Sequence, residues 1–144
     1  MLQKNIAEVR VFNRFYTRVT GLLDKYILHS NYTLPEARIL YEIYHNENIQ
    51  AGDIIASTGI DKGYLSRILK IFVAKKLVAK KRSVQDGRSV HLSLTTQGKR
   101  EFEALNAVQD EEIKKLLEML LVDEREKLVY HMAEINKILS KTIS

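Results

Sequence analysis

The fold is decided by residues 61–94, DKGYLSRILKIFVAKKLVAKKRSVQDGRSVHLSL. Along this stretch the spacing of apolar residues changes from that of a helix to that of a strand. Apolar side chains recur every three or four positions over residues 62–75, which predicts an amphipathic helix with Asp61 as its N-cap. The side chains expected to face the core are Leu65, Ile68, Leu69 and Phe72. Apolar and polar residues then alternate over residues 89–94, as in a half-buried strand. Because Asp86-Gly87 lies between two strand-like runs, we expect a basic β-hairpin at Lys80–Leu94.

A short helix is expected immediately upstream, at about residues 51–57, with Ile54 and Ile55 facing the core. Thr58-Gly59-Ile60 then interrupts the helical pattern. A short helix, a glycine-containing turn and a second amphipathic helix make a helix-turn-helix. With the hairpin directly after it, the sequence predicts a mainly α fold with a small β-hairpin wing, the winged helix-turn-helix.

Longer helices are expected on both sides of this central part. One spans residues 2–29, where apolar side chains lie three or four positions apart. Residues 33–36 (Thr-Leu-Pro-Glu) form a capping box that starts another helix. The expected core face of that helix is Ala37, Leu40, Tyr41 and Tyr44. A helix capped by two threonines follows over residues 95–120, and a capping box at residues 123–126 opens the last one.

Positive charge is concentrated in the central part of the chain. The net charge of the whole chain is +5. Residues 62–91 contain nine Lys and Arg residues and a single acidic one, Asp86, whereas residues 1–61 and 100–144 are each slightly acidic. Such a compact basic segment is typical of proteins that bind the phosphate backbone of nucleic acids. The alternative is a solvated basic face with no partner.

The composition excludes several kinds of site. The chain of 144 residues has no cysteine, so it has no disulfide, thiolate metal site or cysteine nucleophile. Its four histidines lie far apart without ligand spacing, and we expect neither a metal nor a cofactor. No nucleophile–base pair, phosphate-binding glycine loop or pair of catalytic carboxylates is visible, so no enzyme is expected. Without a secretory signal or an apolar run of about 18 residues, we expect a cytoplasmic protein with no membrane partner.

The helix over residues 62–75 carries most of the candidate DNA-binding residues. A major groove about 12 Å wide admits one helix, which offers donors and acceptors to base edges. The candidates are Asp61, Lys62, Gly63, Tyr64, Ser66, Arg67 and Lys70. Lys62 and Arg67 would read guanine or grip phosphate, and a phosphate contact alone or an intramolecular salt bridge is the alternative for Arg67. Gly63 either lets the backbone approach DNA closely or satisfies a packing constraint.

The hairpin adds the candidates Lys81, Arg82, Asp86 and Arg88. Arg88 lies next to the hairpin tip, where an extended arginine would meet the negative potential of a narrow minor groove. Asp86 is unusual on a surface that faces DNA, because a carboxylate repels phosphate. We infer that Asp86 orients Arg88 or a nearby cation. Formation of the Asp-Gly turn is the simpler interpretation, and it need not exclude that pairing.

At these residues the sequence resembles the MarR family of bacterial winged-helix regulators. Residues 86–98, DGRSVHLSLTTQG, look like the family's wing signature, an Asp and an Arg two apart followed by LT-x-x-G. Residues 34–72 fit the same pattern, and the resemblance covers nearly the whole chain. It implies a single MarR-type domain over residues 1–144 that acts as a homodimer on double-stranded DNA. By position, Asp61–Lys70 resembles the recognition helix and Arg88 the wing-tip arginine.

A narrower similarity exists to the MarR-like half of proteins that carry a C-terminal GNAT acetyltransferase. It rests on VFNRFYTR (11–18), EARILYE (36–42) and GYLSRIL (63–69). The chain ends at Ser144, which leaves no room for an acetyltransferase, so that activity is not expected here. The chain is then either a free-standing regulator or a fragment. The alternative function is a DNA-binding or regulatory module related to such a fusion protein, without catalysis of its own.

The terminal helices carry more apolar positions than one small winged domain needs. We expect residues 1–30 and 96–144 to form a two-fold dimer interface beside a DNA-binding lobe at residues 33–95. The apolar side of the last helix is expected to consist of Leu128, Met132, Ile135, Ile138 and Leu139. A monomer with a larger core is the alternative. A dimer would place its recognition helices one DNA turn apart, about 34–36 Å, and predicts a pseudo-palindromic operator.

The favoured function is a transcriptional regulator, expected to be a repressor, whose two heads shift between DNA-competent and incompetent spacings when a ligand prefers one state. The family resemblance suggests small aromatic or phenolic effectors. Five tyrosines either line a ligand pocket or belong to the core: Tyr16, Tyr26, Tyr32, Tyr41 and Tyr44. A third hypothesis is a helical interaction module whose basic segment binds an acidic protein.

Overall fold

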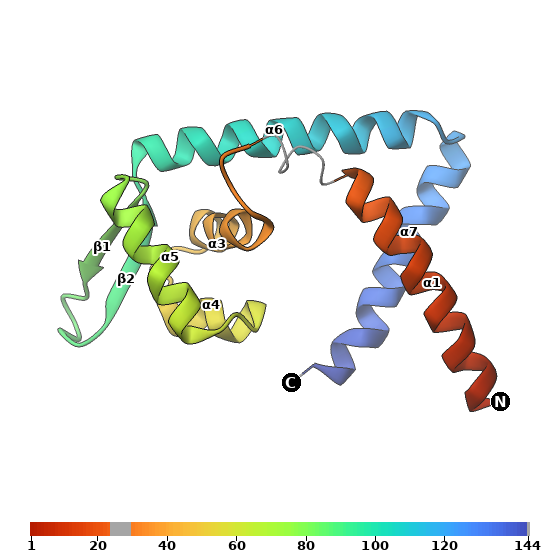
Figure 1. Cartoon of the computed structure of the whole chain (residues 1–144), viewed down its shortest axis with the longest axis horizontal. Coiled ribbons are helices and arrows are strands. Elements are labelled where there is room, and N and C mark those ends of the chain that lie inside the picture. Colours follow the sequence, from red (N-terminus) through yellow and green to blue (C-terminus); the bar gives the residue numbers. More distant parts are fainter. Residues whose placement is uncertain (24–29, 144) are drawn as a thin grey trace. The chain divides into compact units, whose positions relative to one another are not determined.

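The computed structural model describes residues 1–23 and 30–143. The elements are α1 (Leu2–Leu23), α3 (Leu34–His45), α4 (Ala51–Thr58), α5 (Lys62–Ala74), β1 (Val78–Arg82), β2 (Val90–Leu94), α6 (Thr96–Glu118), α7 (Val122–Leu139) and a 3-10 turn, Ser140–Thr142 (Figure 1). The predicted fold class is confirmed, because the chain is mainly helical and its sheet is one antiparallel hairpin. The chain divides into two compact units, residues 1–109 and 110–144. No described helix is both long and apolar enough to cross a membrane.

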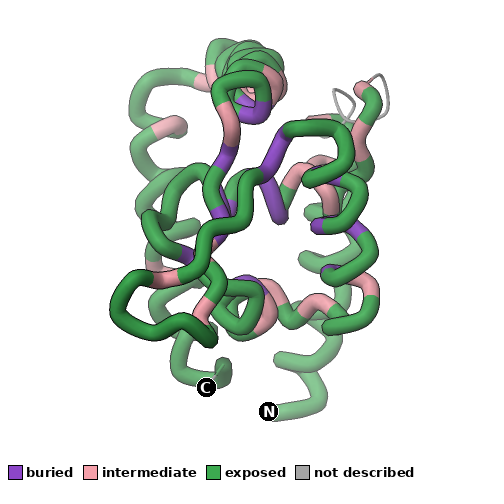
Figure 2. Tube along the Cα trace, turned by 90° about the vertical axis from the view of Figure 1, so that its left-hand side faces the viewer, coloured by how far each residue is buried: buried purple, intermediate pink, exposed green. Residues whose placement is uncertain are grey.

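The core of the first unit lies where α3, α4, α5 and the hairpin face one another, and Figure 2 shows the buried positions of these elements turned inward. The core face predicted for α5 is confirmed, since all four of its apolar side chains are buried. Phe72 of that face has no exposed surface. On α4, Ile54 is fully buried and Ile55 packs against the core from its edge, also as predicted.

The hairpin is fixed to this core along one face. Its strands pair with Val78 opposite Leu94 and Lys80 opposite Leu92. The backbone N–H of Leu92 also donates to the carbonyl oxygen of Ile49, which precedes α4, at 2.8 Å. Because Ile49, Val78, Leu92 and Leu94 are all buried, the hairpin is held in place beside the helix-turn-helix.

The hairpin differs from the expected one in its limits. Its first strand begins at Val78, two residues before the predicted start at Lys80. Residues 83–89 form the connection, and Asp86-Gly87 is not a two-residue turn between the strands. Instead Ser89 N donates to Asp86 O at 3.0 Å, so a four-residue turn closes within a longer loop. The basic wing is therefore a wide loop on a short ladder.

The start of α3 is as predicted. Thr33 Oγ1 accepts from the backbone N–H of Glu36 at 3.3 Å, and Glu36 Oε1 accepts from the backbone N–H of Thr33 at 3.2 Å. This reciprocal pair is the capping box expected at residues 33–36. It satisfies backbone donors that the first turn of a helix leaves without partners.

The core face predicted for α3 is only partly right. Leu40 is buried, but Tyr41 and Tyr44 are 43% and 39% exposed, and Ile39 and Ile43 are buried in their place. Ala37, also predicted to face the core, is half-buried. The helix is rotated so that its isoleucines pack inward. The tyrosine rings lie against Phe102 of α6, with ring centroids 6.3 and 4.6 Å away.

The terminal helices differ from the predicted ones in detail. The helix predicted over residues 2–29 is confirmed as α1 to Leu23, and residues 24–29 with Tyr26 lie outside the described residues. Thr95 Oγ1 accepts from Gly98 N at 3.0 Å and so caps α6 as expected. The capping box predicted at residues 123–126 is wrong by two positions. Because α7 begins at Val122, Glu124 is the carboxylate that reaches back, and it accepts from Leu121 N at 2.8 Å.

Candidate nucleic-acid interface

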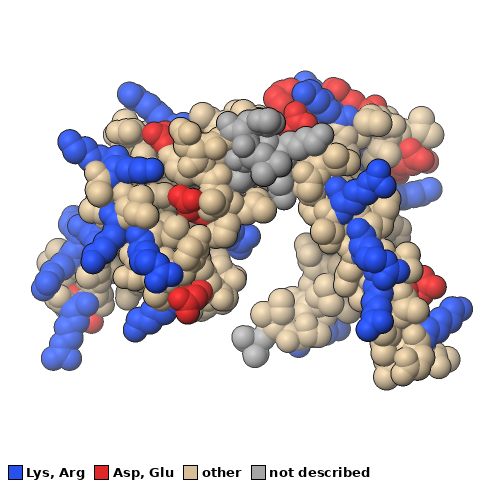
Figure 3. All heavy atoms as spheres, viewed as in Figure 1, with Lys and Arg blue, Asp and Glu red and all other residues tan. Residues whose placement is uncertain are grey.

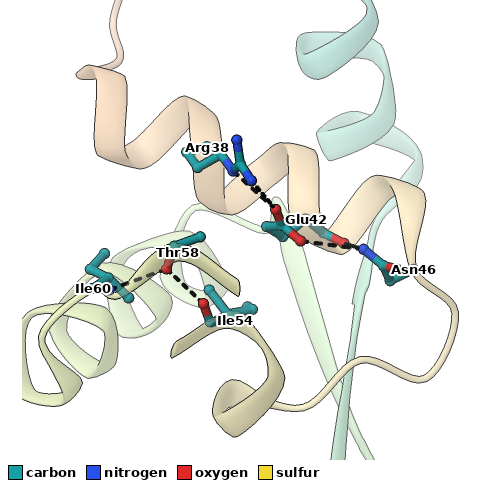
Figure 4. A network of polar contacts seen from close by, with 6 residues as sticks. All are labelled: Arg38, Glu42, Asn46, Ile54, Thr58 and Ile60. Atoms are coloured by element: carbon teal, nitrogen blue, oxygen red, sulfur yellow. Dashed lines mark hydrogen bonds and ion pairs between the residues drawn. The ribbon is translucent and has the colours of Figure 1, made fainter. Parts of the chain in front are cut away.

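The turn between α4 and α5 is held by the hydroxyl of Thr58. Thr58 Oγ1 donates to the carbonyl oxygen of Ile54 at 2.6 Å and accepts from the backbone N–H of Ile60 at 3.2 Å (Figure 4). Gly59 between them has a φ of +69°, a left-handed conformation that glycine adopts without steric cost. This turn sets the direction of α5 relative to α4.

Asp61 begins α5 as its N-cap, as predicted. Its Oδ2 accepts from the backbone N–H of Tyr64 at 2.9 Å. A carboxylate at this position also interacts favourably with the positive end of the helix dipole. Asp61 is thus engaged by its own helix, and this local role explains an acidic residue on a basic surface.

The remaining candidates on α5 divide by exposure. The exposed ones are Lys62, Gly63, Ser66, Arg67 and Lys70. Tyr64 is half-buried and packs against the core cluster. Figure 3 shows Lys and Arg side chains crowded over the part of the molecule that α5 and the hairpin form. The structure therefore brings the basic helical and hairpin candidates onto neighbouring elements and leaves them in solvent.

Gly63 does not answer a packing requirement of the core. A Cβ atom at this position would meet only the tips of two flexible side chains, Asp61 Oδ2 at 3.3 Å and Arg67 Nη1 at 3.9 Å. The position is exposed. Close approach by a partner at Gly63 stays a prediction.

Arg67 has no intramolecular salt bridge. Over the part of the chain that the structure describes, ion pairs join Arg38 to Glu42, Lys115 to Glu112 and Lys127 to Asp123. The contact that Arg67 does make is with an aromatic ring, because its guanidinium carbon lies 5.8 Å from the ring centroid of Tyr64. The donors of the guanidinium thus stay available for a partner.

The wing loop is ordered by the side chain of Asp86. Its Oδ1 accepts from the backbone N–H of Arg88 at 3.0 Å, and its Oδ2 accepts from Ser89 Oγ at 3.1 Å. Ser83 Oγ accepts from the backbone N–H groups of Gln85 and Asp86, both at 3.3 Å. Asp86 therefore orients the backbone of Arg88, not its guanidinium, and the interpretation of Asp86 as a turn-forming residue holds.

The cations of the hairpin point to both sides of the ladder. Lys81 lies opposite His91 and Arg82 opposite Val90, so consecutive basic side chains alternate between the two faces. Both basic residues are exposed, as is Arg88. Such an arrangement spreads positive charge around the wing, which suits a loop lying beside a phosphate backbone.

Polar contacts on α3 were not found by sequence reasoning. Glu42 is 6% exposed and binds the guanidinium of Arg38 at 2.8 Å, and Asn46 Nδ2 donates to its Oε2 at 3.4 Å (Figure 4). Tyr44 OH donates to Glu103 Oε1 at 3.0 Å. This hydrogen bond and the negative charge of Glu103 raise the pKa of Tyr44 above its ordinary value. The contacts of Glu42 are local to α3, whereas the Tyr44–Glu103 hydrogen bond joins α3 to α6. Only the spacing of Arg38 and Glu42, four apart, could have suggested one of them.

A metal site has no support among the described residues, which contain no group of three His, Asp or Glu side chains placed to hold an ion. The histidines illustrate why. His45 stacks among Tyr41, Tyr44 and Phe102, whereas His91 lies on the hairpin ladder. The interface is thus one of exposed cations and hydrogen-bond donors.

The sequence was compared with models of known protein families and with curated proteins. Residues 30–89 match the model of the MarR family, which covers α3, α4, α5 and the wing loop. A curated relative is the uncharacterized HTH-type transcriptional regulator YdgJ of Bacillus subtilis, 27% identical over 97 residues. The match takes in 67% of this chain and 59% of YdgJ, so the chain spans somewhat more than half the length of that relative.

Solved structures share the fold at low sequence identity. A mutant of MarR from E. coli, in complex with operator DNA, superposes with a TM-score of 0.71 at 23% identity, covering 94% of this chain and 97% of that one. BpsR of Bordetella bronchiseptica, whose DNA binding is regulated by 6-hydroxynicotinic acid, gives a TM-score of 0.68 at 21% identity. The match covers 88% of this chain and 91% of BpsR. These similarities concern the arrangement of helices and wing.

Proposed function

Because the chain belongs to the MarR family of winged helix-turn-helix transcriptional regulators, we propose that it binds double-stranded DNA in a sequence-specific manner and regulates transcription in the cytoplasm. In this proposal α5 enters the major groove and the wing loop follows the backbone into the adjacent minor groove. The family is one of regulators and not of enzymes, in agreement with the prediction that the chain has no catalytic activity.

One observation carries the proposal. Every basic side chain of α5 is exposed while its apolar face is buried, and the exposed cations of the hairpin follow on the neighbouring element. Residues 62–91 hold nine of the chain's 23 Lys and Arg residues. Counterion release from phosphate would supply affinity, and the polar side chains of α5 would supply sequence preference. The operator-bound MarR of E. coli supports DNA as the partner of this fold.

We propose that the working unit is a homodimer. Neither α1 nor α7 buries a residue within the single chain. The exposed large apolar residues on these helices include Phe12, Phe15, Val129, Tyr130, Ile135 and Ile138. Monomeric soluble proteins rarely expose contiguous apolar surface of more than a few hundred Å². A two-fold interface made by these helices would cover it and would present two α5 helices to a pseudo-palindromic operator.

Repression released by a small molecule completes the proposal. BpsR supports the existence of such control within this fold, since 6-hydroxynicotinic acid regulates its DNA binding. In the present chain an effector would act by binding one spacing of the two DNA-binding lobes better than the other. The alternative is a regulatory module related to an acetyltransferase fusion protein, on which the family matches have no bearing.

Selection of bound sequences from random duplex DNA tests the proposal. The full chain is incubated with the pool at physiological salt, with and without aromatic acids, while sedimentation measures its mass. We expect an enriched pseudo-palindrome with half-sites one helical turn apart, bound by two chains. A pool without enrichment, or equal affinity for the palindrome and its scrambled version, would overturn sequence-specific binding and would favour a basic module for an acidic protein.

A further inference from the structure

Tyr64 is anchored at the start of α5 through both its backbone and its side chain. Its backbone N–H is bound by the carboxylate of Asp61 at 2.9 Å, which fixes the first turn of the helix. Its side chain packs against the core cluster, and the residue is half-buried.

Arg67 occupies that next turn and lies over the ring. The two residues are three positions apart, a spacing that brings side chains together on a helix. The guanidinium carbon is 5.8 Å from the ring centroid, within the range of a cation–π contact. Arg67 forms no ion pair with any described residue.

We propose that Tyr64 is a positioning residue that holds the Arg67 guanidinium ready to read a base pair, so that the pair of residues sets operator selectivity. The inference rests on the proposed function, because it assigns a task within DNA recognition. Tyr64 was selected from the sequence as a DNA contact. Its half-buried ring makes it a platform for another side chain.

The physical reason lies in the flexibility of arginine. A free arginine at the protein surface populates many rotamers, and ordering it on binding costs conformational entropy. A ring anchored in the core removes part of that cost before DNA arrives. A cation–π contact takes none of the N–H donors of the guanidinium into a hydrogen bond with the ring, so those donors remain available for guanine O6 and N7.

A double-mutant cycle with Tyr64→Leu and Arg67→Ala tests this inference. The measurements are affinities for the selected operator and for an operator changed at the base pair whose preference Arg67→Ala abolishes. Tyr64→Leu is expected to weaken operator binding about two- to fivefold and to reduce the preference at that base pair, from the usual strength of an exposed cation–π contact. In the Arg67→Ala background the same change is expected to have no further effect. Tyr64→Phe keeps the ring and is expected to behave as the wild type.

The outcomes separate the inference from the proposed function. Equal losses of operator affinity from Tyr64→Leu in both backgrounds would mean that Tyr64 contacts DNA itself. No loss of affinity in either background would mean that the contact between Tyr64 and Arg67 does not contribute to binding. Either result overturns the positioning role and leaves the proposed function standing. A wild-type chain that prefers no sequence overturns the proposed function and the inference with it. Thermal unfolding of Tyr64→Leu provides the control, since a loss explained by unfolding would reduce binding to all DNA equally and leave the base preference unchanged.

Discussion

At the tip of the wing, two residues of opposite charge have separate tasks. The carboxylate of Asp86 accepts hydrogen bonds from Arg88 N and Ser89 Oγ, and both bonds stabilise the turn. The guanidinium of Arg88 has no ion-pair partner among the described residues and is exposed. The acidic residue therefore shapes the loop through local hydrogen bonds, while the guanidinium of the neighbouring arginine stays available for a partner.

Arg88→Ala is expected to weaken operator binding roughly tenfold and to lower the slope of log affinity against log salt by about 1. Dimerisation should be unchanged, because the wing is remote in sequence from α1 and α7. Fluorescence anisotropy at several salt concentrations and sedimentation measure the two properties. Lys127→Ala, at a side chain 72% exposed on α7, is the control that removes the same charge elsewhere. Unchanged operator affinity in Arg88→Ala would refute the role of the wing.

At the scale of the elements, α5 and α6 each begin with a side-chain cap, and each start is tied to a different neighbour. The cap of α5 is Asp61, within the helix-turn-helix. The cap of α6 is Thr95, whose hydroxyl also donates to the carbonyl oxygen of Lys76 at 2.6 Å. The start of α6 is thus bound to the connection between α5 and β1, so the end of α5 and the beginning of α6 are held by the same residue.

Asp61→Ala is expected to lower the free energy of unfolding by about 1 kcal/mol, because the backbone N–H of Tyr64 loses its acceptor. Asp61→Asn should leave stability nearly unchanged, since asparagine caps helices as well as aspartate. The same Asn variant should bind nonspecific duplex DNA more tightly, because a negative charge near phosphate is removed. Chemical denaturation and anisotropy give the two readouts. Equal destabilisation by Ala and Asn would contradict the capping role.

Gly98→Ala is expected to destabilise the chain by about 1–3 kcal/mol. A Cβ atom at this position would overlap the carbonyl oxygen of Leu77 and lie 3.0 Å from its carbonyl carbon, so backbone would have to move. Gly52→Ala in α4 is the matched control, because a Cβ atom there meets nothing within 4 Å. The control should be neutral or stabilising, as alanine favours helix over glycine. Thermal unfolding compares the two variants, and equal midpoints would contradict the close approach of α6 to Leu77.

At the scale of the whole molecule, the two compact units are different in character. The first contains the buried core of the winged lobe. The second, residues 110–144, contains no buried residue among those described. The connection between α6 and α7 is stabilised by Arg125, whose Nε donates to the carbonyl oxygens of Leu117 at 2.7 Å and Leu120 at 3.2 Å. A unit with a stabilised helix connection and exposed apolar side chains is suited to packing against another chain.

Ile135→Glu is expected to raise the dissociation constant of the dimer at least about tenfold, since a dimer interface there would have to bury an unpaired charge. Ile135 is 38% exposed on α7, on the apolar side predicted for that helix. Operator affinity should fall in parallel, because one operator needs two lobes. Sedimentation over a range of concentrations measures the equilibrium, and Lys127→Glu serves as the control on the same helix. A variant that keeps the wild-type mass and operator affinity would argue against an α7 interface.

Local features of this protein could be predicted from its sequence. The core face of α5, the caps at Thr33 and Asp61 and the basic hairpin were all expected, and all depend on residues a few positions apart. Helical period, cap chemistry and strand alternation act over that same short range. The basic segment of the candidate interface could also be predicted, because the positions of Lys and Arg residues along the chain are given by the sequence.

Other features were decided by tertiary structure. Which face of α3 is buried was decided by elements distant in sequence, since Ile39 and Ile43 are buried in the core while Tyr41 and Tyr44 lie at its edge against the buried Phe102. The contacts of Asp86 and the contact of Arg67 with Tyr64 join residues only two or three positions apart, yet the sequence did not show which of several partners each side chain takes. The sequence by itself determined the helices, the hairpin and their charge, since these arise from neighbouring residues. Only packing between distant elements decided which apolar side chains form the core, because that choice depends on neighbours far apart in the sequence.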